Sequence, residues 1–140
     1  MQTFLPYDDI TLSIRCLDYK RLGKQRVEAK QILNILLNRT NSMAWRNHPA
    51  VLMWKGFEEC LKLYHNQCIL RWKYLGYKNT MELEKVNWSL MECPIWFGDN
   101  NFHASHRSNL LRKDKVYYGK FKWKEKTDLP YVWPVRKSQI

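Results

Sequence analysis

The chain of 140 residues carries 24 Lys and Arg against 13 Asp and Glu, which gives a formal charge of +11. This length suits a single domain, residues 1–140, that can bury its own core. The charge predicts a polyanionic partner, first of all nucleic acid. We expect no membrane partner, because the aromatic residues are spread along the chain and are not gathered on one basic amphipathic segment.

Several expectations follow from patterns that the sequence lacks. No apolar run approaches the ~20 residues that cross a bilayer, and the N-terminus "MQTFLPYDDI" lacks the pattern of a signal peptide. We therefore expect an intracellular monomer, cytoplasmic or, in a eukaryotic host, nuclear. The four cysteines have no CxxC spacing, so we expect reduced thiols. Without a glycine-rich phosphate loop, GxSxG or paired CxxC, the sequence argues against nucleoside triphosphatases, serine hydrolases and zinc fingers.

Two helices are predicted in the first part of the chain. Asp8 or Asp9 can cap a short helix that runs to about Leu17. A longer amphipathic helix is predicted over residues 19–38, because its apolar residues recur at helical spacing on one face. The sequence therefore places charged side chains on this second helix close to the core.

Arg26 falls inside the apolar stripe of this helix, and Glu28 lies on its flank. An arginine that faces the core needs a partner or a water-filled cleft. A structural ion pair with Glu28 is one interpretation, and a polar cleft in which Glu28 performs chemistry is the other. In the second case the neighbouring side chains could hold phosphates: Lys20, Arg21, Lys24, Gln25 and Lys30.

The strongest helical pattern in the chain begins at Pro49 and continues to Leu75, where Gly76 can end it. Just before it, Arg46 and His48 lie in a loop with Trp45. Backbone N–H groups at a helix N-terminus favour an anion, and an exposed tryptophan could stack on a base. The alternative is a loop that Trp45 closes by packing inward.

Three more elements are predicted in the second half of the chain. A short helix should run from Asn79 or Thr80 to about Met91. Another, which Asp99 or Asn100 can cap, should cover residues 101–113 and is followed by a brief turn at 115–118. The tail "DLPYVWP" should be extended and packed on the body, with aromatic side chains that could line a cleft. The fold class is therefore mainly α, a single-domain irregular bundle of about five helices with an extended C-terminal tail.

The helix over residues 101–113 is the second site candidate. His103, His106 and Arg107 can address one side of it, where they could contact a substrate. A histidine hydrogen-bonded at a packed interface is the alternative. The HxxH pair lacks a further ligand at suitable spacing, so we expect neither a metal nor another cofactor. Arg107, Arg112 and Lys113 are candidate phosphate contacts, or else part of an ordinary solvated face.

Five segments along nearly the whole chain belong together: "MQTFLPY", "LDYKRLGKQRVEAKQIL", "WRNHPAVLMWKGFEECL", "FHASHRSNLLRKD" and "DLPYVW". With them the chain resembles small bacterial and viral proteins classed with the pyrimidine dimer DNA glycosylases of endonuclease V type. The resemblance implies a glycosylase for damaged double-stranded DNA that is also an abasic-site lyase.

The resemblance also implies roles for individual residues. In that family the amine of the mature N-terminus attacks C1′ of the damaged nucleotide to form an imine, and a glutamate on a helix assists. Glu28 matches that glutamate, with Arg26 as the arginine that positions phosphate or sugar. The family nucleophile is a small residue exposed by removal of methionine, whereas residue two here is Gln2. We therefore expect Met1 to be retained and to supply the amine, unless Lys24 replaces it or Glu28 activates water.

Two other classes of function fit the same residues. A basic module that binds DNA or RNA without chemistry would need the phosphate contacts but not Glu28. A different nucleic-acid or nucleotide hydrolase would use Glu28 with His103 or His106 as acid and base, and would need these groups near one another.

Overall fold

The computed structural model describes residues 1–42 and 44–135. These residues form no strand, which confirms the prediction of a mainly α, irregular bundle of about five helices. No helix among them is long and apolar enough to span a membrane. The helices are α1 (Ile10–Arg15), α2 (Tyr19–Leu36), α3 (Pro49–Leu52), α4 (Glu58–Tyr74), α5 (Asn100–Lys113) and α6 (Lys115–Tyr118), with 3-10 turns η1 (Trp88–Leu90) and η2 (Gly119–Phe121).

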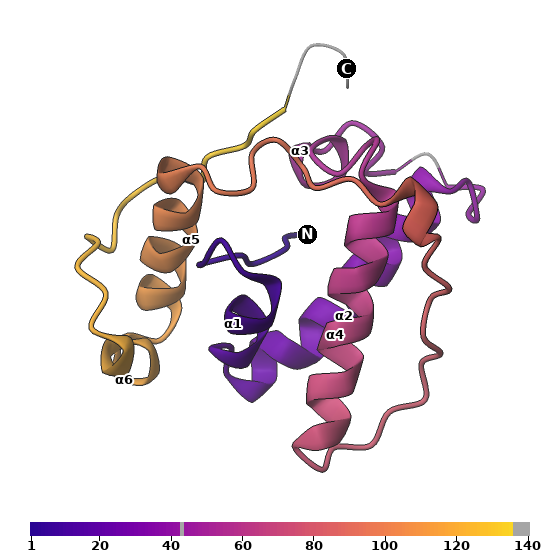
Figure 1. Ribbon diagram of the computed structural model, residues 1–140. Coiled ribbons are helices and arrows are strands. Elements are labelled where there is room, and N and C mark those ends of the chain that lie inside the picture. The colour runs from indigo at the N-terminus through magenta and orange to yellow at the C-terminus, as the bar shows by residue number, and fades with distance from the viewer. Residues whose placement is uncertain (43, 136–140) are drawn as a thin grey trace.

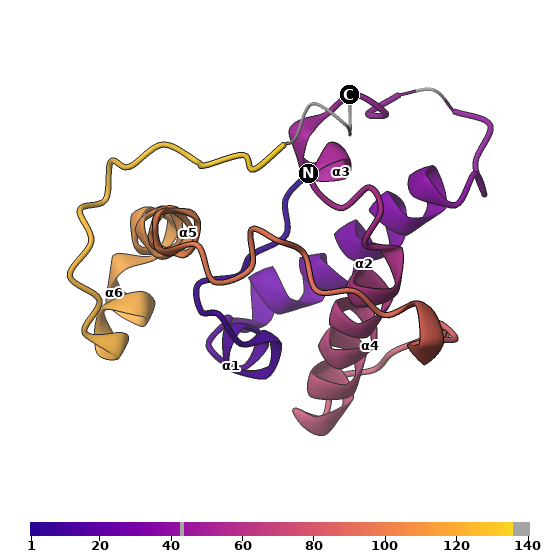
Figure 2. The ribbon, with the colours of Figure 1, turned by 45° about the horizontal axis from the view of Figure 1, so that its top comes forward.

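The main packing unit is the pair α2 and α4, and α1 packs against α4. The first residues of the chain run as an extended segment between α5 on one side and the α2–α4 pair on the other (Figures 1 and 2). Residues from both halves of the chain share one apolar core, including Leu5, Leu22, Trp54, Tyr64 and Phe102. The N-terminal segment is thus part of the core, and its first residues lie beside α2.

Two side-chain caps and one glycine set three helix ends where the sequence predicts them. Asp9 accepts a hydrogen bond from Leu12 N–H (2.9 Å) at the start of α1, and Asp99 accepts one from Asn101 N–H (2.9 Å) at the start of α5. After α4 the chain turns at Gly76, whose φ of +90° lies in the left-handed region that glycine favours.

The single helix predicted from Pro49 to Leu75 is wrong, because the structure divides it into α3 and α4. The break lies at Gly56, whose φ of +94° is incompatible with a continuing right-handed helix. The turn allows both Trp54 and Phe57 to enter the core, where each is almost fully buried. Apolar periodicity alone does not reveal this break, because the buried residues on both sides keep helical spacing.

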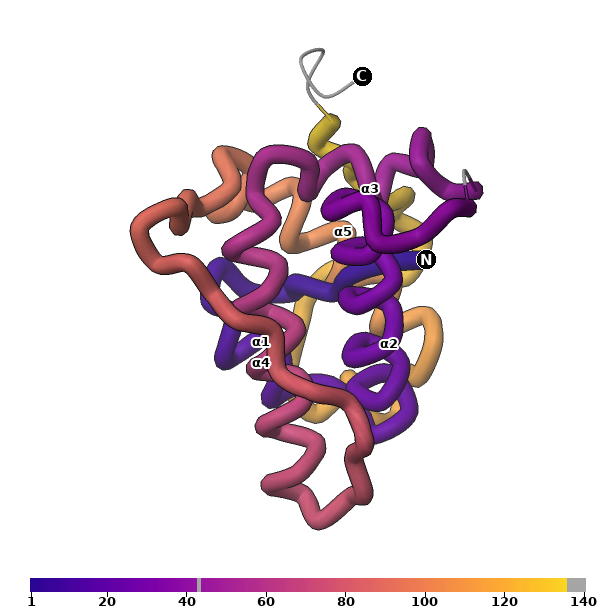
Figure 3. The backbone as a smooth tube through the Cα atoms, turned by 90° about the vertical axis from the view of Figure 1, so that its right-hand side faces the viewer, coloured from indigo at the N-terminus to yellow at the C-terminus, as the bar shows by residue number. Residues whose placement is uncertain are grey.

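The helix predicted from Asn79 to Met91 is also wrong. Residues 77–87, which we call the strap, form an extended segment over the edges of α2 and α4 (Figure 3). The side-chain amide of Asn66 accepts from Glu84 N–H (2.7 Å) and donates to Glu84 C=O (2.8 Å), so α4 satisfies backbone groups that a helix would otherwise pair.

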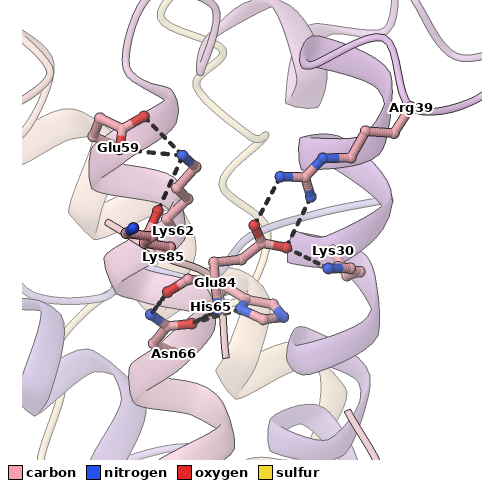
Figure 4. A network of polar contacts seen from close by, with 8 residues as sticks. All are labelled: Lys30, Arg39, Glu59, Lys62, His65, Asn66, Glu84 and Lys85. Atoms are coloured by element: carbon pink, nitrogen blue, oxygen red, sulfur yellow. Dashed lines mark hydrogen bonds and ion pairs between the residues drawn. The ribbon is translucent and has the colours of Figure 1, made fainter. Parts of the chain in front are cut away.

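The carboxylate of Glu84 fastens the strap to α2. Arg39 donates two hydrogen bonds to it (2.9 and 3.0 Å), and Lys30 donates a third (Figure 4). These donors, first of all Arg39, lower the pKa of Glu84 to about 2 although its side chain is buried. The carboxylate is therefore an ion-paired anchor.

The tail after η2 lies extended against α5, as predicted from its two prolines. Ser108 Oγ accepts from Leu129 N–H (3.1 Å), and one turn earlier Ser105 Oγ accepts from Val132 N–H (3.2 Å). Two serines three residues apart on α5 thus hold successive backbone groups of the tail. This docking carries Tyr131 and Trp133 toward the N-terminal segment.

Candidate active site

One side-chain amide on α2 fixes both the N-terminal segment and Glu28. The buried Gln25 accepts from Phe4 N–H (2.9 Å) and from the Tyr64 hydroxyl (2.5 Å) through Oε1. Its Nε2 donates to Gln2 C=O (2.9 Å) and to Glu28 Oε2 (3.0 Å). Because both donors and both acceptor positions are used, Gln25 holds the extended backbone and the carboxylate in one fixed arrangement.

Two histidines on α5 hold the other side of the same segment. His103 Nδ1–H donates to Leu5 C=O (2.7 Å) while its Nε2 accepts from Gly98 N–H (2.9 Å). His106 Nδ1 accepts from Leu5 N–H (2.8 Å). Burial lowers the pKa of both rings, that of His106 to about 3, so both imidazoles are neutral near pH 7. The HxxH pair is a clamp on the Leu5 backbone.

These anchors bring Met1 to the wall of a cavity of about 590 Å³. The cavity lies between the first half of α2, the N-terminal segment, the last residue of α5 and the tail. It is lined by Met1, Gln2, Phe4, Lys20, Arg21, Lys24, Gln25, Glu28, His48, Lys113, Tyr131 and Trp133.

The pKa values of Glu28 and His48 are shifted by burial and by the nearby α-amine. Burial raises the pKa of Glu28, against the opposing effects of the α-amine, Lys24 and Gln2 N–H. The pKa of His48 is lowered by burial and then by the same α-amine. His48 Nδ1 also accepts from Ala50 N–H (3.0 Å) as the cap of α3, so the neutral ring carries its proton on Nε2.

The rest of the wall is cationic or aromatic. Four basic side chains face the cavity from α2 and from the end of α5, and one of them, Arg21, donates to Asp18 (3.1 Å). Tyr131 and Trp133 lie with ring centroids 5.4 Å apart, and the Trp133 ring meets His48 edge-on at 5.7 Å. Positive charge beside flat ring faces suits a nucleotide, whose phosphate and base need those two kinds of contact.

The structure brings together about half of the site residues predicted from sequence. The cavity contains Met1, Arg21, Lys24, Gln25, Glu28, His48 and Lys113. Arg26, Arg46, His103, His106, Arg107 and Arg112 do not line it. Neither His103 nor His106 lines the cavity with Glu28, and each ring binds the Leu5 backbone, so the hydrolase interpretation with either ring as partner of Glu28 stays a prediction.

Arg26 is the clearest departure from expectation, because it shares neither a cleft nor an ion pair with Glu28. Its guanidinium lies 4.4 Å from the centroid of the Trp72 ring and donates to Asn79 Oδ1 (2.6 Å). Both partners lie on the strap side of α2. Helical spacing correctly predicted that Arg26 lies close to the core. It could not identify Trp72 and Asn79 as the residues that Arg26 contacts.

Three other predicted phosphate contacts lie outside the cavity in different settings. Arg107 pairs with Glu125 and donates to Pro6 C=O (2.7 Å), so it joins the tail to the N-terminal segment. Arg46 contacts backbone carbonyls, among them that of Ile35 near the end of α2 (3.4 Å). Arg112 is exposed, and its role as a phosphate contact stays a prediction.

Sequence reasoning missed Gln2 and Phe4 as parts of the site. No local signal marked them, because the stretch before Pro6 has neither helical spacing nor alternation of polar and apolar residues. Among the described residues, no group of three or more His, Cys, Asp or Glu side chains is arranged to hold a metal ion.

The comparisons with known proteins bear on the same part of the chain. A family model described as pyrimidine dimer DNA glycosylase matches residues 1–85, which are 85 of the 140 residues. No curated protein and no solved structure matches the chain. The matched part contains α1 to α4 and every residue of the cavity wall except Lys113, Tyr131 and Trp133.

Proposed function

The chain belongs to the pyrimidine dimer DNA glycosylase family, and from this we propose that it removes a damaged pyrimidine from double-stranded DNA in the cavity beside α2. The observation that carries the proposal is that Met1 and Glu28 line one cavity with a cationic rim. The α-amine is close enough to Glu28 to lower the pKa of its carboxyl group. A nucleophile and an acid–base group therefore face the same space.

The first chemical step would be attack by an uncharged amine on C1′ of the damaged nucleotide. A C–N bond forms while the N-glycosidic bond breaks, and the base leaves with the bonding electrons and takes up a proton. The sugar ring then opens between C1′ and O4′, which gives an imine at C1′ and a hydroxyl at O4′. In a chain that begins at Met1, its α-amine is the group positioned to do this.

Glu28 would serve as the acid and then the base. Burial raises the pKa of its carboxyl group, which favours the protonated form that can donate to the leaving base or to O4′. The resulting carboxylate can take a proton from C2′, and β-elimination then expels the 3′-phosphate. The hydrogen bond from Gln25 keeps the carboxyl group oriented through these steps.

The cationic and aromatic parts of the wall would bind the substrate. Lys20, Lys24 and Lys113 can contact phosphates on the damaged strand, since phosphate contacts position DNA without reading its sequence. Tyr131 and Trp133 offer ring faces to the base. A cavity of about 590 Å³ is within the usual range for small-molecule sites, so a nucleotide turned out of the duplex can enter it.

Borohydride trapping tests this proposal directly. The protein, first shown by mass spectrometry to begin at Met1, is incubated with abasic or ultraviolet-damaged duplex and the reductant. We expect a covalent protein–DNA adduct that maps to Met1, because reduction fixes an imine formed by an amine. Acetylation of the α-amine should abolish the adduct and leave binding of DNA intact.

The remaining outcomes separate the mechanisms. Cleavage without an adduct would replace the amine by water activated by Glu28 and would remove the lyase step. An adduct at Lys24 would move the nucleophile to that side chain. Absence of both cleavage and adduct on damaged, abasic and intact DNA would overturn the glycosylase proposal and leave a binding module.

A further inference from the structure

A stack of four side chains runs along the face of α2 that turns away from Glu28. The guanidinium of Arg26 lies over Trp72 at 4.4 Å, the Trp72 and Tyr77 rings stack at 4.3 Å, and Tyr77 stacks on Tyr19 at 6.1 Å with 24° between the planes. Tyr19 and Arg26, seven residues apart, share this face because seven residues make nearly two helical turns.

Gly23 makes room for this stack in the middle of α2. A Cβ atom at Gly23 would lie 3.1 Å from two ring atoms of Trp72, tighter than ordinary van der Waals contact. Glycine inside a helix costs about 1 kcal/mol relative to alanine, so the helix loses stability at this position in exchange for close approach of the ring. Trp72 Nε1–H also donates to Lys78 C=O (2.9 Å), which joins the inner part of the stack to the strap.

The outer end of the stack is open to solvent. Tyr19 is 54% exposed and Tyr77 is 40% exposed, whereas Trp72 beneath them is partly covered. Within the described residues, the Tyr19 hydroxyl has no hydrogen-bond partner. The hydrogen bonds that join the stack to the strap come from its inner members, Arg26 to Asn79 and Trp72 to Lys78 C=O.

The position of this open end links it to the cavity. Lys20 follows Tyr19 in the chain and lines the cavity, and on the helix it lies about 100° from Tyr19 toward Glu28. Lys78 follows Tyr77 and is exposed. Each outer tyrosine thus has a lysine beside it, which is the combination of ring face and cation that binds a nucleic-acid strand.

We propose that Tyr19 and Tyr77 form a platform on which an unpaired base stacks outside the cavity, on the strand whose damaged nucleotide lies inside it. The inference rests on the proposed function, because that function supplies the strand and places its damaged nucleotide in the cavity. Lys20 binds the phosphate between the two positions. The platform accepts any base, because every base presents a π-face.

The test compares two duplexes that carry the same central abasic analogue, one fully paired around it and one with two unpaired nucleotides beside it. Affinities are measured by fluorescence anisotropy for the wild type, Tyr19→Ala, Tyr19→Phe and Tyr74→Ala. Tyr74 is a matched control, because it is 80% exposed and lies beside a basic side chain, Arg71, but belongs to a different cavity. Melting curves confirm that each variant is folded.

We expect Tyr19→Ala to weaken binding of the duplex with unpaired nucleotides by about 5- to 150-fold, the range for loss of one base–aromatic stack. Tyr19→Phe should bind like the wild type, and the salt dependence of binding should be unchanged because no charge is removed. Equal losses on both duplexes, no loss, or the same loss in Tyr74→Ala would overturn the platform. Wild-type protein that binds neither duplex would instead overturn the proposed function.

Discussion

Two carboxylates on opposite sides of α2, the buried Glu84 and the half-buried Glu28, have pKa values shifted in opposite directions. Glu84 accepts directly from Arg39 and Lys30, and its pKa falls to about 2. Glu28 has cations nearby but accepts its side-chain hydrogen bond from a neutral amide, and burial raises its pKa. The difference shows that direct contact with a cation turns a buried carboxylate into a structural anchor. Glu28 lacks this contact, so the effect of burial dominates and raises the pKa of its carboxyl group.

Replacement of Glu28 should have the largest effect on activity. Glu28→Gln keeps the shape and the hydrogen bond from Gln25, so glycosylase turnover should fall by about 100- to 10,000-fold, the usual contribution of a general acid–base group. A raised carboxyl pKa means that ionisation of Glu28 opposes folding as pH rises through that pKa, so a permanently neutral amide should not lower the melting temperature. Turnover and thermal melting are measured on the same preparation.

A matched control for that experiment is Glu82→Gln, which neutralises an exposed carboxylate on the strap. It should change neither turnover nor melting. If Glu28→Gln instead lost stability and activity in proportion, Glu28 would be structural like Glu84, and the contrast between the two carboxylates would disappear.

Replacement of Glu84 should give the converse result, with a loss of stability and normal activity in the folded fraction. Glu84→Gln leaves Arg39 and Lys30 without their anion, and because both partners reach solvent we expect a loss of about 2 to 3 kcal/mol in the free energy of unfolding, below the value for a fully buried pair. Denaturant melts at pH 7 measure it.

The same contact predicts a pH dependence of stability. Because the folded-state pKa is depressed, the stabilisation is fully present above the unfolded-state pKa of about 4.3, and it is lost as pH falls through about 2. Wild type and Glu84→Gln should therefore converge in stability toward pH 2. A constant difference between them over this range would show that the ion pairs do not stabilise the strap.

The confirmed and the missed predictions differ in how far apart the interacting residues lie in the sequence. Local signals such as the Asp9 and Asp99 caps and Gly76 set helix ends through contacts within a few residues, and these predictions are confirmed. The strap was missed because its geometry depends on Asn66, which lies 18 residues from Glu84. Local sequence alone therefore favoured a helix from Asn79 to Met91, because it gives no sign of the distant contact with Asn66.

About half of the site residues predicted from sequence line the cavity, for a related reason. Helical spacing placed Gln25 and Glu28 on one flank of α2, and both line the cavity. The same spacing grouped His103 with His106, but it could not show that both rings bind the backbone of Leu5, about a hundred residues earlier. Residue type and angle are local properties, whereas the partner that decides between catalysis and packing comes from the tertiary fold.

The smallest effect we expect separates cations that bind phosphate from cations that hold the fold. Lys113 lines the cavity, and Arg107, six residues earlier on α5, pairs with Glu125 and Pro6 C=O. Lys113→Gln should reduce the log–log salt slope of DNA binding by about 0.9, since one phosphate contact is lost, without altering the melting temperature.

Two control variants complete this test. Lys85→Gln, on the strap, should leave the slope unchanged. Arg107→Gln should lower the melting temperature, because Glu125 loses its partner. If instead Arg107→Gln changed only the slope, phosphate binding rather than attachment of the tail would be its role, and the division between the cavity face and the structural contacts would need to be redrawn.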